Sequence, residues 1–178
     1  MRLIGLAGKA GSGKDYVADL LIRFAEGAGL EATKVPFALG VRQEIEEELG
    51  VNIPKLYEKP TPQTVRRLLQ WYGTDYRRSE NPDHWVDRGI STAAITDADL
   101  VVFPDVRFQN EIDAIRKLHG KVALVTAPEH VREARIGVVP RHSTEDGVFL
   151  DLDYTVVNDS DEDGPLIDYG LIDYASGE

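Results

Sequence analysis

The feature that most limits how this chain can fold is a glycine-rich stretch near its start. Gly8 is followed after four residues by Gly13 and Lys14, and Asp15 stands where this kind of phosphate-binding loop usually has Ser or Thr. Glycines permit backbone conformations and close approaches that a Cβ atom would block, so successive N–H groups can point into one concavity and hold phosphate oxygens. The spacing predicts a strand, then this loop, then a helix whose N-terminus adds its own N–H groups.

The residues on both sides of the loop agree with that prediction. Residues 3–7 are apolar, as expected of a buried parallel strand. Apolar residues then recur at the spacing of one helix face, at Val17, Leu20, Leu21 and Phe24. A glycine-rich turn without a ligand is the alternative, and it would not require this context. We therefore expect a nucleotide to contact Gly8, Ala10, Gly11, Ser12, Gly13, Lys14, Asp15 and Tyr16.

Two charged side chains of the loop have predicted roles. Lys14 supplies a mobile positive charge for the β and γ phosphates of a nucleotide. The carboxylate of Asp15 can hold Mg²⁺ directly or through water, or it can cap the N-terminus of the helix. The loop pattern therefore leaves the ligands of the metal open.

The overall composition narrows the classes of partner. The 178-residue chain has a formal net charge of −11, which repels polymeric nucleic acid. No apolar run approaches the ~20 residues that cross a bilayer, and the first strand begins at once, so we expect neither a membrane span nor a signal peptide. The chain has no Cys, which excludes a disulfide scaffold and a cysteine zinc site. A cytoplasmic enzyme is the simplest interpretation.

The basic residues of this acidic chain are concentrated in short clusters, which suggests a local pocket for small phosphorylated ligands. Arginines that are merely solvated on helix faces are the alternative for many of them. The clusters are Lys9 with Lys14, Arg66 with Arg67, Arg77 with Arg78, Arg107, and Arg132 with Arg135 and Arg141.

Strand and helix patterns alternate along the chain. Strands are predicted at 3–7, 32–37, 99–103, 122–126 and 154–157. Helices are predicted between them, one of which is expected to stop at Gly73, and residues 74–83 and 128–145 are expected to be irregular, the latter as a mobile polar segment. Such alternation predicts an α/β fold with a parallel sheet, here of five strands, covered by helices on both faces in one domain over 1–178. Two copies of Leu-Ile-Asp-Tyr near the C-terminus have no functional interpretation.

Ligands of parallel α/β sheets bind beyond the carboxyl ends of the strands. The loop at 8–14, the pair Phe37-Ala38 and the segment 105–107 all follow predicted strands. Three segments that lie far apart in the sequence are therefore expected to converge on one edge of the sheet.

Three further segments carry a family resemblance. Residues 66–78 read RRLLQWYGTDYRR, residues 105–111 read DVRFQNE, and an Arg pair at 132 and 135 precedes HSTE at 142–145. Together with the loop, and in this order, they resemble the bacteriophage-type deoxynucleoside monophosphate kinases, relatives of adenylate kinase, from residue 3 to about residue 158. The Lys-Asp ending of the loop also occurs in that family, although it departs from adenylate kinases proper.

The resemblance implies transfer of the γ-phosphoryl group of ATP to a deoxynucleoside 5′-monophosphate, with Mg²⁺, on a three-layer P-loop NTPase fold. It places an acceptor-binding helical part at about 38–95 and a short lid at about 127–145. It also implies small nucleotides as partners and a cytoplasmic location, that of the host cell if a phage encodes the protein. An acceptor phosphate is already an anion near neutral pH, so cation density is needed more than a strong general base.

The candidate catalytic residues follow from this match. They are Lys14, Asp105, Arg107, Arg132 and Arg135. Asp105 would contact Mg²⁺ through water or orient the acceptor, which makes Asp15 and Asp105 the metal candidates. Arg107 would grip a phosphate with its fork of donors, or form a salt bridge with Glu111. Arg132 and Arg135 would face the phosphates from the lid, or lie on a solvated helix.

The acceptor site is the second expected pocket. Its candidates are Phe37, Ala38, Arg42, Arg66, Gln70, Thr74, Arg78, Trp85 and Arg107. Arg66 and Gln70 are one helical turn apart, and the amide of Gln70 can read a base edge. Phe37 and Trp85 can stack on a base, with an apolar core position as the alternative for both. His142 and Glu145 match the family pattern but have no assignable mechanism.

Two other functions remain open. One is a kinase of another small metabolite, such as a phosphomevalonate-like phosphomonoester or an alcohol, for which Asp105 would serve as a base. The other is a nucleotide-binding switch that hydrolyses slowly, but this offers no reason for a second Arg-rich pocket at 66–78. A homodimer is an option for the oligomeric state.

Overall fold

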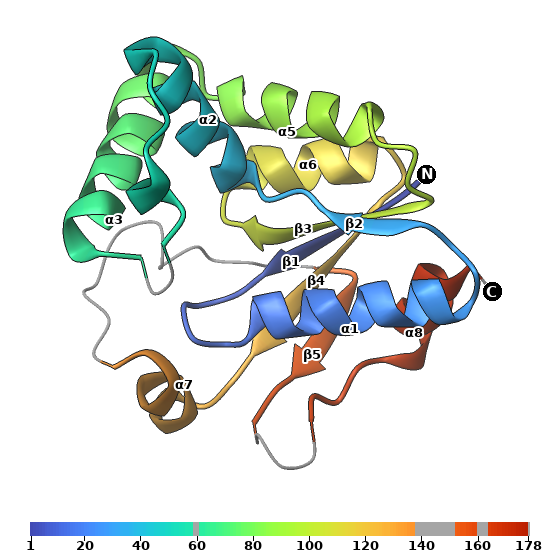
Figure 1. Cartoon of the computed structure of the whole chain (residues 1–178). Coiled ribbons are helices and arrows are strands. Elements are labelled where there is room, and N and C mark those ends of the chain that lie inside the picture. The colour runs from blue at the N-terminus through green and yellow to red at the C-terminus, as the bar shows by residue number, and fades with distance from the viewer. Residues whose placement is uncertain (59–60, 138–151, 160–163, 178) are drawn as a thin grey trace. The chain divides into compact units, whose positions relative to one another are not determined.

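The computed structural model describes residues 1–58, 61–137, 152–159 and 164–177 (Figure 1). The chain divides into two compact units by its internal contacts. One consists of Met1–Val35 and Thr96–Glu178, and the other is Pro36–Ile95. We call them the sheet unit and the helical unit and describe each by itself.

A five-stranded parallel sheet forms the centre of the sheet unit (Figure 1). Its strands are β1 (Arg2–Ala7), β2 (Ala32–Lys34), β3 (Leu100–Val106), β4 (Lys121–Thr126) and β5 (Tyr154–Val157). They lie in the order β2-β3-β1-β4-β5, and every neighbouring pair is parallel. The predicted α/β class, with a parallel sheet of five strands, is confirmed.

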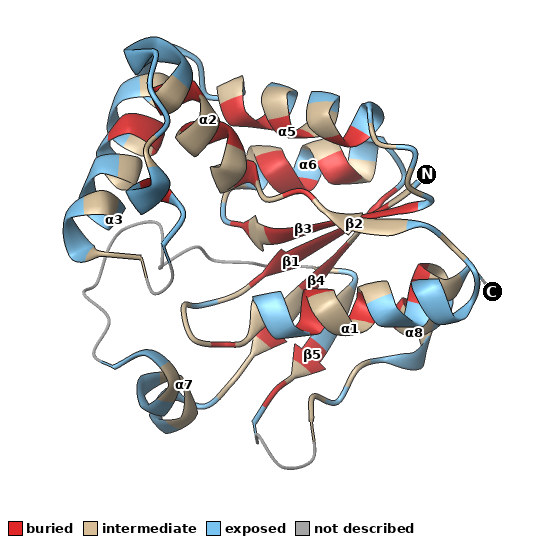
Figure 2. Cartoon of the chain, in the orientation of Figure 1, coloured by how far each residue is buried: buried red, intermediate tan, exposed pale blue. Residues whose placement is uncertain are grey.

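Helices cover both faces of this sheet, as predicted. The helices of the sheet unit are α1 (Lys14–Gly27), α6 (Gln109–Lys117), α7 (Glu129–Ile136) and α8 (Tyr169–Ser176). Helices α1 and α8 lie on one face and α6 on the other (Figure 1). Successive strand residues point to opposite faces, so Ile4 and Leu6 pack with Val17 and Leu21 of α1, whereas Gly5 faces α6. Figure 2 shows the resulting band of buried residues along β1, β3 and β4.

The repeated Leu-Ile-Asp-Tyr segments have different structures. In the first copy, Leu166 exchanges backbone hydrogen bonds of 2.8 and 3.1 Å with Val157 at the end of β5. Asp168 of this copy caps α8, because its carboxylate accepts a 2.8 Å hydrogen bond from the N–H of Gly170. The second copy lies inside α8 and buries Leu171 against the core of the sheet unit. The repeat therefore forms a helix start and a helix body, not two equivalent units.

Two strand ends differ from the prediction. Strand β2 ends at Lys34 rather than at residue 37, because Pro36 lacks an N–H group and precedes helix α2, whose first residue is Phe37. Strand β3 continues past residue 103 to Val106, so Asp105 lies within the strand instead of after it. Each strand therefore ends three residues away from its predicted end, β2 earlier and β3 later.

The helical unit consists of short helices. They are α2 (Phe37–Leu49), the 3₁₀ turn η1 (Pro54–Leu56), α3 (Gln63–Gln70), the π-helix η2 (Trp71–Arg77), α4 (Arg78–Glu80) and α5 (His84–Ala94). Its core contains Val41, Ile45, Leu56, Tyr72 and Trp85. The buried apolar side chains of this cluster come from α2, η1, η2 and α5.

The predicted helix stop at Gly73 and irregular segment at 74–83 are wrong. The chain instead continues through Gly73 as the π-helix and stays helical to Glu80. Gly73 is not among the glycines with positive φ, so it does not form a helix-ending turn. It is buried, and a Cβ atom there would lie 3.2 Å from the Val41 side chain. This glycine therefore permits close helix packing, a reason that local sequence rules cannot distinguish from a helix stop.

None of the helices in the described ranges is long and apolar enough to cross a membrane. Within the predicted lid at about 127–145, the structure shows the helix α7, which carries Arg132 and Arg135. Residues 138–145, with Arg141, His142 and Glu145, lie outside the described residues.

Candidate nucleotide site

The loop between β1 and α1 follows a path that requires glycine. Gly8 has a φ of +141° and Gly13 a φ of +88°, both in the region that other residues rarely adopt. A Cβ atom on Gly8 would lie 2.2 Å from the carbonyl oxygen of Val125 in the neighbouring strand β4. The predicted order of strand, glycine-rich loop and helix is therefore present, and the loop backbone is pressed against the sheet edge.

The start of α1 favours an anion. Gly13 is the N-cap residue and has no side chain that could occupy the N–H groups of the first turn. These groups and the helix dipole give the N-terminus a partial positive charge. Asp15, the second residue of the helix, is exposed.

The ammonium group of Lys14 lies against the loop backbone. Its Nζ donates hydrogen bonds to the carbonyl oxygens of Gly8, at 2.7 Å, and of Lys9, at 3.1 Å. The cation is thereby folded back over the loop instead of extending into solvent. Contact of Lys14 with a phosphate stays a prediction.

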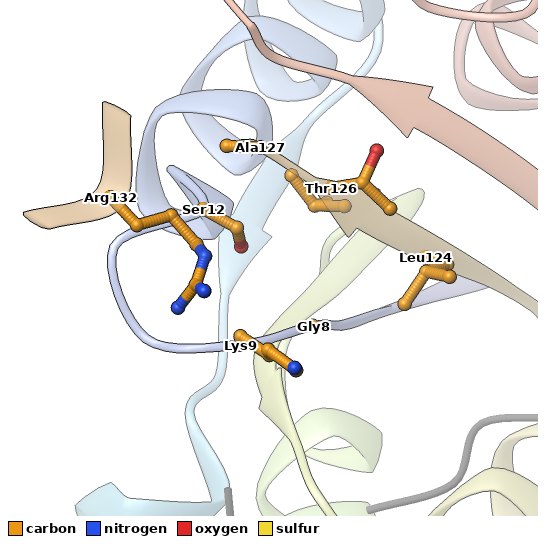
Figure 3. Close-up of a pocket in the computed structure, with 8 residues that line it drawn as sticks. Gly8, Lys9, Ser12, Leu124, Thr126, Ala127 and Arg132 are labelled. Carbon is orange, nitrogen blue, oxygen red and sulfur yellow. The ribbon is translucent and has the colours of Figure 1, made fainter. Parts of the chain in front are cut away.

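Ser12 holds a buried hydroxyl group without a hydrogen-bond partner among the residues that the structure describes. The residue lines a pocket of about 330 Å³ together with Gly8, Lys9, Arg132 and residues 124–127 (Figure 3). Leaving a buried hydroxyl unsatisfied costs about 1–3 kcal/mol, so a ligand oxygen here would remove a penalty. The glycine-shaped loop, its cations and this hydroxyl fit the phosphates of a nucleotide.

Two arginines of α7 reach the loop. Arg132 Nη1 lies 3.4 Å from the carbonyl oxygen of Ala10, and Arg135 Nη1 lies 3.3 Å from that of Gly11. Figure 3 shows Arg132 extending from α7 toward the loop. The structure thus brings both arginines to the predicted nucleotide loop, while their contact with phosphate stays a prediction.

Asn158 is a site residue that the sequence analysis missed. It follows β5, is buried, and its Nδ2 donates a 2.9 Å hydrogen bond to the carbonyl oxygen of Ser12. One signal could have identified it: a polar residue directly after an apolar run predicted as a strand, the argument that singled out Asp105. The structure thus adds β5 to the strands whose carboxyl ends meet at the loop.

Asp105 and Arg107 lie where β3 ends. Strand β3 neighbours β1, and Val106 pairs with Ala7 immediately before the loop. The buried carboxylate of Glu111 accepts hydrogen bonds from the backbone N–H groups of Arg107, at 2.7 Å, and Phe108, at 3.1 Å. An ion pair between Arg107 and Glu111 was the alternative to the expected phosphate contact. The carboxylate of Glu111 caps α6 and fixes the backbone that carries Arg107.

The metal candidates do not form a protein cage. Among the described residues, no three His, Asp or Glu side chains gather as a metal site would require. Asp15 is exposed at the start of α1 and Asp105 is half-buried at the end of β3. Mg²⁺ usually keeps several waters and binds through one or two carboxylates plus substrate phosphates. The residues therefore fit a magnesium ion that arrives with phosphates.

The predicted acceptor residues other than Arg107 lie in the helical unit. Arg66 is exposed and Gln70 half-buried, one turn apart on α3, and Thr74 is half-buried in η2. Arg78 donates a 3.0 Å hydrogen bond to the carbonyl oxygen of Pro82. The structure keeps these four residues on one continuous helical stretch.

Arg42 and Ala38 have a structural role in the helical unit. The guanidinium of Arg42 donates to the carbonyl oxygens of Leu56, at 2.8 Å, and of Ala38, at 2.9 Å. These hydrogen bonds connect α2 to η1. Contact of either residue with a substrate stays a prediction.

The rings of Phe37 and Trp85 are buried, so their predicted stacking on a base is corrected. Phe37 is 4% exposed, and a Cβ atom on Gly89 would lie 2.5 Å from its ring. Trp85 is 3% exposed and donates its indole N–H to the carbonyl oxygen of Gly73 at 2.7 Å. Both rings occupy core positions, which was the alternative interpretation.

Glu44 forms the centre of a buried polar cluster that the sequence analysis did not identify. Its carboxylate accepts hydrogen bonds from Arg77 Nε at 2.5 Å and from the Tyr72 hydroxyl at 3.0 Å. His84 Nε2 and Arg88 Nη1 lie 2.6 and 3.4 Å from the same carboxylate. Burial alone would raise the pKa of Glu44, but hydrogen bonds from His84, Tyr72 and Arg77 outweigh it and lower this pKa.

Comparisons with known proteins identify the family of this chain. The sequence model described as deoxynucleotide monophosphate kinase matches residues 42–164. A protein of Acanthamoeba polyphaga mimivirus named "Putative deoxynucleotide monophosphate kinase" is 32% identical over 150 residues, covering 72% of this chain and 75% of that protein.

Solved structures share the fold at low sequence identity. The APS kinase CysC of Mycobacterium tuberculosis, in complex with AMPPNP and APS, aligns over 99% of this chain and 94% of its own, with a TM-score of 0.54 and 15% identity. The protein TT1252 of Thermus thermophilus aligns over 98% and 93%, with a TM-score of 0.50 and 20% identity. These similarities show the fold alone. The family match and the viral relative go further: the chain belongs to the deoxynucleotide monophosphate kinase family and is a phosphotransferase.

Proposed function

We propose that this kinase transfers the γ-phosphoryl group of ATP to a deoxynucleoside 5′-monophosphate and produces the diphosphate. The bond between the γ phosphorus and the bridging oxygen of ATP breaks, ADP leaves, and a phosphate oxygen of the acceptor bonds to that phosphorus. The observation that carries this proposal is the loop at 8–14, where the unpartnered hydroxyl of Ser12 and the cations of Lys14, Arg132 and Arg135 surround a glycine-shaped concavity.

The donor phosphates would take over partners that are now backbone carbonyls. Lys14, Arg132 and Arg135 bind carbonyl oxygens of the loop, which are uncharged, whereas phosphate oxygens carry negative charge and attract these cations more strongly. Phosphoryl transfer depends mainly on positioning and on neutralising the charge spread over the moving group. These three cations are suited to both tasks.

We propose Asp15 and Asp105 as the carboxylates nearest to Mg²⁺. The ion would neutralise phosphate charge when it is bound with ATP. Asp15 lies at the start of α1, and Asp105 lies two strand positions from the Phe103–Gly5 pair at the loop side of the sheet. Their placement supports a water-mediated or direct contact from either side of the phosphates.

The acceptor half of the proposal rests on α3 and η2 of the helical unit. Arg66 is exposed on α3 and offers a forked donor to a monophosphate, while the amide of Gln70 lies one turn away on the same side of the helix. Because the acceptor phosphate is itself the nucleophile, no side chain must remove a proton from an alcohol. The proposed substrates are small nucleotides of the cytoplasm.

An acceptor screen tests this function. Release of ADP from ATP is followed with each common ribo- and deoxyribonucleoside monophosphate, with simple phosphomonoesters and with alcohols. Release that rises only with deoxynucleoside monophosphates supports the proposal. Release that rises with another phosphomonoester would assign a different acceptor, and slow release that ignores every acceptor would replace the kinase with a nucleotide-hydrolysing switch.

A further inference from the structure

We propose that Asn158 is a positioning residue of the nucleotide site, which holds the phosphate loop and Arg135 of α7 in a fixed arrangement. This inference rests on the proposed use of ATP at the loop. Asn158 is not expected to touch the reacting atoms, and it acts through the two groups to which it is hydrogen-bonded.

The side chain of Asn158 is fixed from several directions. The residue is 2% exposed and directly follows β5. Its backbone N–H donates a 2.8 Å hydrogen bond to the carbonyl oxygen of Thr126 in β4, which anchors the residue to the sheet. Its Nδ2 then reaches the loop and donates to the carbonyl oxygen of Ser12 at 2.9 Å.

The amide of Asn158 supports the loop at its last glycine. A Cβ atom on Gly13 would lie 2.1 Å from Asn158 Nδ2, so the amide is packed directly against the backbone there. Gly13 precedes Lys14 and is the N-cap of α1. A displacement of this amide would therefore free the part of the loop from which both the lysine and the helix N–H groups project.

The oxygen end of the Asn158 amide faces Arg135 of helix α7. Arg135 Nη2 lies 3.4 Å from Asn158 Oδ1, and Arg135 Nη1 lies 3.4 Å from the backbone oxygen of Asn158 and 3.3 Å from that of Gly11. An asparagine can donate at one end and accept at the other, a combination that neither a carboxylate nor an apolar side chain provides. The amide thus couples the loop to an arginine proposed to bind phosphate.

This coupling predicts a specific loss of affinity for the donor nucleotide. A loop that is held in its binding conformation loses less conformational freedom when phosphate binds. Without Asn158, the carbonyl of Ser12 would remain buried without its partner, and Arg135 would lose one of its anchors. The acceptor residues in the helical unit make no use of this hydrogen bond.

The test is a calorimetric titration of the full-length protein with Mg²⁺ and AMPPNP, a non-hydrolysable analogue of ATP. We expect Asn158→Ala to weaken binding about tenfold, since a buried carbonyl loses its donor. Asn158→Asp preserves the size of the side chain but places an oxygen opposite the Ser12 carbonyl, and a similar loss is expected. The exposed Asn52 supplies the matched control, and Asn52→Ala should bind AMPPNP like the unmodified protein.

Two further measurements separate positioning from a general structural role. Affinity for a deoxynucleoside monophosphate should stay unchanged in both Asn158 variants. In a protein that already carries Arg135→Ala, Asn158→Ala should weaken AMPPNP binding less than it does in the unmodified protein, because the two residues act together. The positioning role would be overturned if the Asn158 variants lost affinity for both nucleotides equally. It would also be overturned if the effects of the two single substitutions on AMPPNP binding simply added up in the double variant.

The outcomes also distinguish this inference from the proposed function. If the unmodified protein fails to bind AMPPNP, the ATP-dependent function is wrong and the inference is lost with it. If the unmodified protein binds AMPPNP and a folded Asn158→Asp variant binds it equally well, only the role of Asn158 is refuted. If Asn158→Ala does not fold, AMPPNP binding by Asn158→Asp, whose side chain has the same size, tests the role of Asn158.

Discussion

The Nε atom of Arg77, in the π-helix, lies 2.5 Å from the buried carboxylate of Glu44 in α2. The same guanidinium also contacts Glu48, which is exposed, and Glu80 at 3.2 Å. Arg77 belongs to the segment that carries the family resemblance, and its carboxylate partners lie in the same helical unit. The pair therefore connects the π-helix to α2 and makes Glu44 the first target for mutation.

Replacement of Glu44 should destabilise the helical unit. In Glu44→Gln, Arg77 and Arg88 lose one charged partner but keep others, and the loss of a hydrogen bond to a charged group costs about 1.5–3 kcal/mol. Chemical denaturation, followed by the fluorescence of Trp71 and Trp85 in the same unit, measures this change. Glu58→Gln, at an exposed position, is the control and should change the free energy of unfolding little.

The stabilisation by Glu44 should also depend on pH. The pKa of Glu44 is lowered in the folded protein, so its stabilising effect is complete above the usual glutamate pKa of about 4.3 and is lost as the pH falls through the folded value. The difference in unfolding free energy between the unmodified protein and Glu44→Gln should therefore shrink below about pH 4. A difference that stays constant down to pH 3 would contradict the lowered pKa.

Loss of the loop cation should abolish most of the activity without unfolding the protein. We expect Lys14→Ala to reduce kcat by about a hundredfold or more, because a positioned charge on the phosphates is removed. Steady-state kinetics together with thermal unfolding measures both effects. Lys117→Ala, an exposed lysine on α6, is the matched control. Near-normal turnover in Lys14→Ala would show that the donor phosphates bind elsewhere.

Arg66 provides a test of the acceptor pocket. Arg66→Ala should raise KM for the deoxynucleoside monophosphate about tenfold and leave KM for ATP nearly unchanged, since a charged hydrogen bond to the acceptor is lost. The neighbouring Arg67 is also exposed but points away from it on the helix, so Arg67→Ala serves as the control. Equal increases in both KM values would argue against two separate pockets.

Two glycines of the sheet unit should respond in opposite ways to the same substitution. Gly8→Ala places a Cβ atom 2.2 Å from the Val125 carbonyl at a φ of +141°, so the loop must move and AMPPNP binding should fall strongly. Gly27, at the end of α1, has open space around it, and Gly27→Ala should preserve binding and stabilise the protein by about 0.5–1 kcal/mol. Calorimetry and thermal unfolding of the two variants provide the comparison.

The sequence was sufficient to predict the sheet and the loop because both depend on local patterns. Apolar runs identified the five strands, and the spacing from Gly8 to Lys14 identified the loop before any contact was known. The pairing of Ala7 with Val106 then brings the end of β3 beside the loop, as expected for parallel strands.

Residues that depend on distant partners could not be predicted in this way. Asn158 donates to Ser12 across 146 positions of the chain, and Tyr72 reaches Glu44 across 28. A glycine after a helical pattern, such as Gly73, usually ends the helix. Here the helix continues through Gly73, which allows close packing against Val41. Such roles follow from tertiary packing, which overrides local propensity.

The helical unit is inserted between β2 and β3, two strands that are direct neighbours in the sheet and pair from Ala32 and Leu100 onward. Two neighbouring parallel strands always need a crossover connection between them. The sheet fixes only the two points where this connection leaves one strand and enters the next. What lies between those points is open to replacement. On the proposed function, a different helical insert between these two points would change the acceptor while the loop and the sheet keep their structure.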